Sequence, residues 1–187
     1  MKFLPGHTYH VFNQGNNQGT TFREETDYFI FLTLVRRNIF PYCEILAWCL
    51  MPNHFHLMIH TTDKSCETIK QGGLNIEVLT NGIRKLLSGY ARIYNSKYDR
   101  TGSLFRQKTK CKILTEPDLS MSKYGPGDYV YACFNYIHCN PVEAGLVTHP
   151  AQWEYSSYPD YAKARNGSLC NQVLAAQVCG FSELDFR

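Results

Sequence analysis

The stretch EILAWCLMPNHFHLMIHT, residues 44–61, decides the fold of this chain. Its first part, Glu44–Met51, is almost entirely apolar, Pro52 and Asn53 form a turn, and a second strand-like run follows over His54–Thr61. Two short runs of this kind joined by a two-residue turn are typical of a β-hairpin. The sequence therefore predicts an antiparallel hairpin here, with the other elements arranged around it.

The segments on either side of this hairpin supply the other elements of a single domain. The sequence predicts a strand at 7–14, a helix at 23–38 capped by Thr20 or Thr21, a helix at 75–98 and a strand near 110–114. The complete order is strand-helix-strand-strand-helix-strand, which is the ferredoxin-like βαββαβ arrangement. We therefore expect an α+β fold with an antiparallel sheet, helices on one face and the other face open to carry a site.

The rest of the chain is predicted to contain two further helices and irregular segments. A loop is expected from Thr115 to Asp128, because this stretch is rich in Pro, Gly and Ser. An additional helix at 128–140 is expected to stop at Pro141, which lacks the N–H that a helix interior needs. A mostly irregular covering segment at 145–159 and a short helix at 171–179 complete the chain.

Composition places the chain among ordinary globular proteins. It has 187 residues, 44% of them hydrophobic and 19% charged, which suits one domain with a sizeable core. No two of its eight cysteines have the Cys-x-x-Cys spacing of a zinc knuckle. The start lacks the apolar run of a signal peptide, and no stretch reaches the length of a membrane span. A cytoplasmic protein with free thiols and no membrane partner is the expectation.

Positive charge is concentrated in one segment, although the net charge is only +3. Residues 84–112 contain nine Lys or Arg and one acid, Asp99, so this segment carries +8 and the rest of the chain −5. Such a belt suits a polyanion, whereas the alternative is a solvated helix face. The side chains expected to contact nucleic acid are Arg84, Arg92, Arg100, Arg106, Lys108 and Lys110. The aromatic residues that could track a nucleic-acid strand beside them are Tyr90, Tyr94, Tyr98 and Phe105. Tyr90 and Tyr94 also fall on the apolar side of the predicted helix, so they are expected to belong to the core.

His54 and His56 are spaced as neighbours on one face of a strand. Residues i and i+2 point the same way, about 7 Å apart at Cα, and Phe55 points to the opposite face with the other apolar residues. Two imidazoles on an open sheet face can bind a divalent metal between them. The alternative is a pair of surface histidines on an edge strand. His60 shares the face but lies too far along the strand for the same ion.

The helix at 128–140 carries a second group of candidate residues. Those that should face the core by their helical spacing are Val130, Cys133, Phe134 and Ile137. Tyr136 and Asn140 lie one turn apart on a stripe roughly 100° from that side, so they can meet at one site. An amide oxygen of Asn140 could complete a metal site, or Asn140 could cap the helix while Tyr136 is a half-buried packing residue. A phenol is mostly protonated at neutral pH, so its attack on a phosphate needs an activated target.

Several ordered blocks of the sequence resemble one known family. MPNHFHL at 51–57 resembles the M-P-N-H-x-H-L signature of the HUH single-tyrosine transposases. YIHCNPV at 136–142, with AGLV at 144–147, is similar to the Y-I-H-x-N-P-V-x-A-G-L-V signature of the REP-associated branch. Further blocks at 13–16, 100–105 and 153–158 follow in order, so the resemblance covers about residues 6–160.

The resemblance implies a metal-dependent transposase that nicks and rejoins single-stranded DNA. Mg²⁺ or Mn²⁺ would be held by His54, His56 and Asn140, and Tyr136 would be the nucleophile that joins the 5′ phosphate of the cleaved strand. The implied partner is single-stranded DNA with REP-like hairpins, and no ATP is needed. Residues 1–160 would form the catalytic domain and 161–187 a C-terminal extension. The branch implies a monomer, while other single-tyrosine transposases are homodimers.

Two other functions stay open from the sequence. An inactive or domesticated relative would bind structured single-stranded nucleic acid without cutting it. A simple metallonuclease would leave free 5′ phosphate ends and no covalent adduct. The sequence departs from the family at Gln14, at Glu143 and in the block at 106–110, positions that bear on DNA contacts and not on the implied chemistry.

Overall fold

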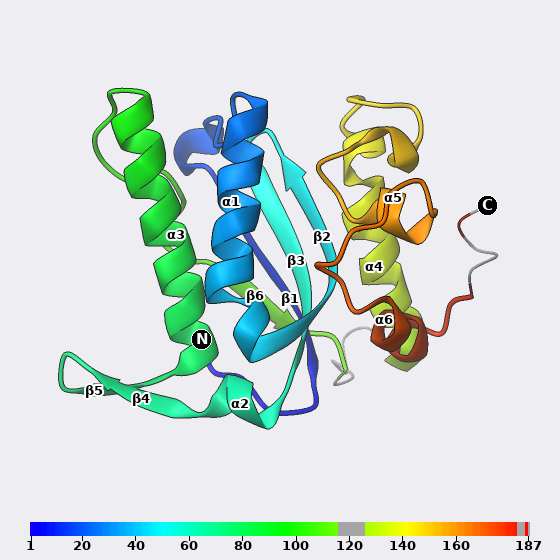
Figure 1. The fold of residues 1–187 in the computed structure, drawn as a ribbon, viewed down its shortest axis with the longest axis horizontal. Helices are drawn as coiled ribbons and strands as arrows, with labels where there is room; N and C mark the ends of the chain where they lie inside the picture. Colours follow the sequence, from blue (N-terminus) through cyan, green and yellow to red (C-terminus); the bar gives the residue numbers. More distant parts are fainter. Residues whose placement is uncertain (116–125, 183–185, 187) are drawn as a thin grey trace.

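A four-stranded antiparallel sheet forms the centre of the molecule (Figure 1). The computed structural model describes residues 1–115, 126–182 and 186. Neighbouring strands pair antiparallel in the spatial order β2-β3-β1-β6, which is the ferredoxin-like order. The predicted α+β fold class is confirmed. The strands are β1 (Thr8–Gln14), β2 (Cys43–Met51), β3 (His54–Thr61) and β6 (Lys110–Ile113).

Two helices, α1 (Glu25–Asn38) and α3 (Val78–Lys97), lie side by side over one face of the sheet (Figure 1). Phe31 of α1 and Leu86 of α3 belong to the same buried cluster as Phe55, which lies between the two histidines of β3. The ring centroids of Phe31 and Phe55 are 5.1 Å apart. The prediction that the apolar residues of β3 point toward the helices is therefore confirmed.

The opposite face is partly covered, which corrects the expectation that it would be open. Phe134 and Ile137 of helix α4 share a buried cluster with Ala47 of β2 and Met58 of β3. The physical reason is that β2 is apolar on both faces, so both faces must be buried. On the β6 side of the same face, Lys110 is exposed to solvent. The helices on this face are α4 (Pro126–Glu143), α5 (Tyr158–Tyr161) and α6 (Gln172–Cys179).

Shorter elements connect these main ones. Because β5 ends at Glu77, α3 begins at Val78 and not at Asn75 as predicted. The predicted covering segment at 145–159 contains one short turn and the first residues of α5. The short elements are η1 (Asn16–Gln18), η2 (Phe40–Tyr42), α2 (Asp63–Cys66), β4 (Thr68–Gln71), β5 (Leu74–Glu77) and η4 (Pro150–Gln152).

Two predicted helix ends are wrong for identifiable reasons. Helix α1 is capped at Glu24, where the Asp27 carboxylate accepts the backbone N–H of Glu24 and the Asp27 backbone N–H donates to the Glu24 carbonyl. Neither of the threonines at 20 and 21 is therefore its cap. Helix α4 continues through Pro141, since a proline in the last turn removes only one N–H and the Ala144 N–H still donates to the Asn140 carbonyl. Of the predicted loop at 115–128, residues 116–125 lie outside the described residues and 126–128 belong to α4.

The C-terminal segment packs on the same body as the sheet. Ala175 and Cys179 of α6 are buried in the cluster that contains Phe134 of α4. Helix α5 runs across residue 160, the predicted end of the catalytic domain, and that boundary stays a prediction. Within the described ranges, none of the helices is both long and apolar enough to cross a membrane.

Gly82 and Gly89 lie on the same helix, α3, but in different surroundings. A Cβ at Gly82 would collide with the carbonyl oxygen of Asn38 in α1, whereas a Cβ at Gly89 would meet only Leu34 Cδ1, at 4.0 Å. We expect Gly82→Ala to lower the free energy of unfolding by roughly 1–3 kcal/mol, because the two helices must move apart. Gly89→Ala should raise it by about 0.5–1 kcal/mol, because alanine is the better helix former. Urea unfolding measures both effects, and the same sign for both would contradict the close approach of α1 and α3 at Gly82.

Candidate functional site

His54 and His56 begin strand β3, on the face that α4 partly covers. In the sheet register, His54 lies opposite Gln14 and His56 opposite Phe12 of β1. The two imidazole rings are perpendicular, with centroids 5.0 Å apart. His54 is partly exposed, whereas His56 is 3% exposed. The pair therefore lies at the end of a central strand, and the alternative of an edge strand does not apply.

Asn140 lies between the two histidines, although it comes from the far end of α4. Its side-chain oxygen Oδ1 is 3.1 Å from His54 Nε2, and its Nδ2 atom is 3.5 Å from His56 Nε2. The residue is 8% exposed. The three residues that the resemblance implies as metal ligands are thus brought together, with the amide oxygen of Asn140 toward His54 and its amide nitrogen toward His56.

The remaining ring nitrogens of the two histidines have partners of their own. His54 Nδ1 is 2.6 Å from Oδ1 of the preceding residue, Asn53. His56 Nδ1 is 2.8 Å from Nε2 of His10, a buried residue of β1. His10 was not singled out from the sequence, because a lone histidine in a strand carries no signal until the register of β1 against β3 is known.

Burial keeps these imidazoles neutral near neutral pH. Burial, followed by the nearby charge of Lys112, lowers the pKa of His10 to about 4. Burial also holds the pKa of His56 well below its usual value, with further contributions from His10 and His54. The pKa of His54 is lowered by burial, against an opposing hydrogen bond from the imidazole to the Asn140 amide oxygen. A neutral imidazole is the form that binds metals.

The facing atoms of His54 and Asn140 are spaced like two neighbouring ligands of a small divalent ion. Cis ligands of an octahedral ion with bonds of about 2.1 Å lie about 3 Å apart, close to the 3.1 Å between His54 Nε2 and Asn140 Oδ1. Among the described residues, no cluster of three or more His, Cys, Asp or Glu side chains could hold a metal by itself. The third protein ligand of such an ion would therefore be the amide oxygen.

Tyr136 stands beside this group, one helical turn before Asn140. Its ring centroid is 5.5 Å from that of His56 and 6.2 Å from that of His10. The side chain is 44% exposed, unlike Tyr90 and Tyr161, which are buried. The phenol is thus accessible to a large substrate while its ring borders the imidazoles.

A pocket of about 270 Å³ opens at Tyr136 and the two histidines. Three of the basic residues predicted to contact nucleic acid, Arg106, Lys108 and Lys110, form its wall. No Asp or Glu is among its lining residues in the described part of the chain. The pocket therefore combines a potential nucleophile, a potential metal site and a cationic wall.

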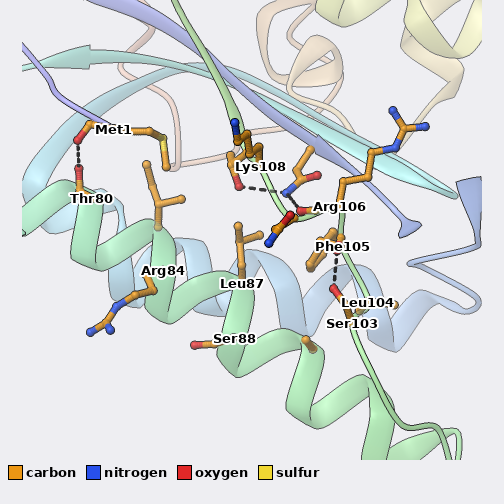
Figure 2. Close-up of a pocket in the computed structure, with 15 residues that line it drawn as sticks. Met1, Thr80, Arg84, Leu87, Ser88, Ser103, Leu104, Phe105, Arg106 and Lys108 are labelled. Carbon is orange, nitrogen blue, oxygen red and sulfur yellow. Dashed lines mark hydrogen bonds between the residues drawn. The ribbon is translucent and has the colours of Figure 1, made fainter. Parts of the chain in front are cut away.

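A second hollow, of about 580 Å³, lies between α3 and residues 103–109 (Figure 2). Arg84 lines it, and Arg106 and Lys108 line both hollows. The apolar side chains of Leu87 and Phe105 also line it (Figure 2). The two hollows are therefore neighbours that share a basic wall.

The remaining predicted nucleic-acid contacts lie elsewhere. Arg92 is exposed on α3 but lines neither hollow, and Arg100 donates to Asn95 in the same helix. Most of the aromatic residues of this segment are part of the core, as the helical spacing predicted for the first two of them. Those that are buried are Tyr90, Tyr94 and Phe105.

Helix α4 is fixed to the sheet by a residue between its two candidate functional residues. His138 is buried, and its Nε2 atom is 2.7 Å from the Ser157 hydroxyl. That hydroxyl in turn accepts the backbone N–H of Trp48 in β2. His138 therefore links α4 to the edge of the sheet while Tyr136 and Asn140 face the histidines.

Comparisons with known proteins identify the fold. No protein-family profile matches the chain, and no curated protein matches its sequence. Among solved structures, a REP-associated tyrosine transposase bound to a REP hairpin aligns with a TM-score of 0.57 and 15% identity, over 91% of this chain and 92% of that chain. A bacterial tRNA(His) guanylyltransferase-like protein in complex with GTP aligns with a TM-score of 0.42 and 12% identity, over 78% and 69%. The chain thus shares the fold of the transposase.

The burial of His138 predicts a pH dependence of stability. Burial lowers its pKa to about 3 from an ordinary 6.5, so the unfolded chain takes up a proton at a higher pH than the folded protein does. The stability that the neutral ring contributes is fully present above pH 6.5 and is lost as the pH falls toward 3. His138→Gln should make the fall in the free energy of unfolding shallower, by up to about 1.4 kcal/mol per pH unit. Urea unfolding at several pH values between roughly 5 and 7 measures this, and an unchanged slope would contradict it.

Proposed function

We propose that this protein is a divalent-metal-dependent DNA transposase of the HUH single-tyrosine type, in the REP-associated branch, which nicks and rejoins single-stranded DNA beside hairpins. The observation that carries this proposal is the convergence of Tyr136 and Asn140 from α4 on His54 and His56 from β3. Tyr136 and the two histidines also line one basic pocket. The fold shared with a REP-associated tyrosine transposase supports it, as do the ordered sequence blocks.

His54, His56 and Asn140 would hold Mg²⁺ or Mn²⁺. Two neutral imidazoles whose Nε2 atoms both face the side-chain amide of Asn140 support this assignment. A bound divalent cation polarises the scissile phosphate and offsets charge in the transition state. Because the ligands come from β3 and α4, the site would also hold the helix with the nucleophile against the sheet.

Tyr136 would be the nucleophile. Its phenol oxygen forms a bond to phosphorus while the bond from phosphorus to the 3′ oxygen of the preceding nucleotide breaks. The phenol proton is released to solvent, and the leaving oxygen takes up a proton to become a free 3′ hydroxyl. The 5′ phosphate remains on the tyrosine as a phosphodiester, so a 3′ hydroxyl can later attack it and rejoin the strand without ATP.

The basic wall would guide the DNA strand. Arg106, Lys108 and Lys110 line the pocket with Tyr136, so their charges would neutralise phosphates next to the scissile one. Since Arg106 and Lys108 also line the hollow that contains Arg84, a strand or hairpin stem leaving the pocket would continue there. Arg92 and Arg100 would contribute at longer range, through the field of the basic belt.

The proposed enzyme acts as a monomer. Tyr136 borders His56 of its own chain, and Asn140 reaches both histidines within the same chain. No second copy is needed to complete the site, in contrast to dimers that exchange their tyrosine helices. A homodimer remains compatible with the proposal only if each copy keeps its own tyrosine.

Tyr136→Phe tests the proposal most directly. We expect the wild-type protein to form a covalent adduct with a labelled single-stranded hairpin substrate in the presence of Mn²⁺ or Mg²⁺. The Phe variant should lose the adduct completely and keep its affinity for the hairpin, because only the nucleophilic oxygen is removed. Denaturing gel electrophoresis detects the adduct, and Tyr131→Phe on the same helix is the matched control.

The same assay separates the alternatives. Hairpin binding without any adduct in the wild type would indicate an inactive or domesticated binding protein. Free 5′ phosphate ends without an adduct would indicate a metallonuclease. His54→Ala should abolish cleavage and leave hairpin affinity nearly unchanged, so persistent cleavage would refute the metal role of His54.

The basic wall predicts a specific salt dependence. Lys108→Ala should weaken hairpin binding and reduce the slope of log affinity against log salt by about 1, because one phosphate contact is lost. Lys70→Ala, in the exposed hairpin of β4 and β5, is the matched control and should leave the slope unchanged. Fluorescence anisotropy over a range of salt concentrations measures both, and equal effects of the two variants would refute the role of Lys108.

A further inference from the structure

We propose that His10 is a positioning residue for the metal site, which holds His56 in the tautomer that turns a bare Nε2 atom toward the ion. The inference rests on the proposed metal role of His56. It concerns a residue of β1 that lies outside the three ligands and the nucleophile. The contact that carries it is the 2.8 Å distance between His10 Nε2 and His56 Nδ1.

The direction of this hydrogen bond follows from the other side of the His56 ring. His56 Nε2 faces Nδ2 of Asn140 at 3.5 Å, and an amide nitrogen carries hydrogens and no acceptor lone pair. Nε2 of His56 must therefore be without a hydrogen, and the single hydrogen of the neutral ring lies on Nδ1. His56 Nδ1–H then donates to His10 Nε2, and His10 carries its own hydrogen on Nδ1. This is the arrangement in which Nε2 of His56 is available to a metal.

His10 is held rigidly enough to impose this choice. It is 6% exposed, and its ring stacks on Phe12 with centroids 4.5 Å apart and an interplanar angle of 27°. Its strand is paired on both sides, with Met58 of β3 opposite it on one side and Lys112 of β6 on the other. The acceptor nitrogen therefore has little freedom to turn away from His56.

His54 has a different and more local partner. Its Nδ1 atom meets Oδ1 of Asn53, the adjacent residue in the turn between β2 and β3. His56 instead depends on a side chain 46 residues away in the sequence. The pairing of β1 with β3 thus sets the geometry of one ligand, and the turn sets that of the other.

The direct test is to locate the hydrogen of His56 in the metal-free protein. Long-range ¹H–¹⁵N correlation NMR distinguishes a hydrogen on Nδ1 from one on Nε2. We expect the Nδ1–H tautomer in the wild type and in His10→Gln, whose side-chain oxygen can accept the same hydrogen bond. We expect a mixture, or the Nε2–H tautomer, in His10→Phe, which keeps the stacked ring but has no acceptor. An Nε2–H tautomer in the wild type would overturn the proposal without reference to any variant.

Metal binding without DNA supplies the second readout. Titration with Mn²⁺, followed by electron paramagnetic resonance of the free ion, should give an affinity about 10–100-fold weaker for His10→Phe than for wild type, with His10→Gln close to wild type. His60→Phe is the matched control, since His60 also makes a hydrogen bond from β3 to β1, with Thr8, but away from the ligands. It should bind Mn²⁺ as the wild type does.

The outcomes separate this inference from the proposed function. Equal Mn²⁺ affinities of folded wild type and His10→Phe, or equal losses in His10→Phe and His60→Phe, would overturn the role of His10 and leave the transposase proposal intact. A wild type that binds no Mn²⁺ would overturn both. If circular dichroism shows that His10→Phe is unfolded, the test rests on the wild-type tautomer and on the Mn²⁺ affinity of His10→Gln. A Mn²⁺ affinity of His10→Gln about 10–100-fold weaker than that of wild type would then contradict the proposal.

Discussion

The docking of α4 on the β2 side of the sheet is the contact on which the rest of the site depends. Phe134 and Ile137 are completely buried in this interface, and His138 links the helix to Ser157 beside β2. Successive helical residues point about 100° apart, so the turn that buries Ile137 directs the neighbouring Tyr136 toward the imidazoles. A rotation of α4 by one residue would remove Tyr136 and Asn140 from the histidines together.

Local sequence patterns predicted the elements of the fold better than their junctions. The hairpin at 44–61, the strand order and the core face of α4 follow from periodicity, and the structure confirms them. Three helix ends were missed. The start of α1 depends on hydrogen bonds between Glu24 and Asp27, and the start of α3 at Val78 depends on the small hairpin before it. The end of α4 at Glu143 depends on a proline that is tolerated in the last turn. The coverage of the second sheet face was missed although β2 is apolar on both faces, because the pattern does not say which helix will bury it.

The candidate site was predictable in its members but not in its support. Spacing brought His54 and His56 to one face and Tyr136 and Asn140 to one stripe, and the resemblance joined the two groups. His10 depends on the strand register, so no local pattern could identify it. In the basic segment, helical spacing already placed the tyrosines at 90 and 94 on the apolar side, where they are buried. Only the structure shows that Arg106, Lys108 and Lys110 line the pocket.

Tyr136 and Asn140 stand on one rigid turn of α4, and this has a consequence for control of the proposed reaction. Any signal that displaced the helix would withdraw the proposed attacking oxygen and a proposed metal ligand in the same movement. In the proposed mechanism, a centre with the complete metal site would therefore also have the nucleophile in place. Strand breakage would be coupled mechanically to retention of the broken end, which protects a genome from unsealed nicks.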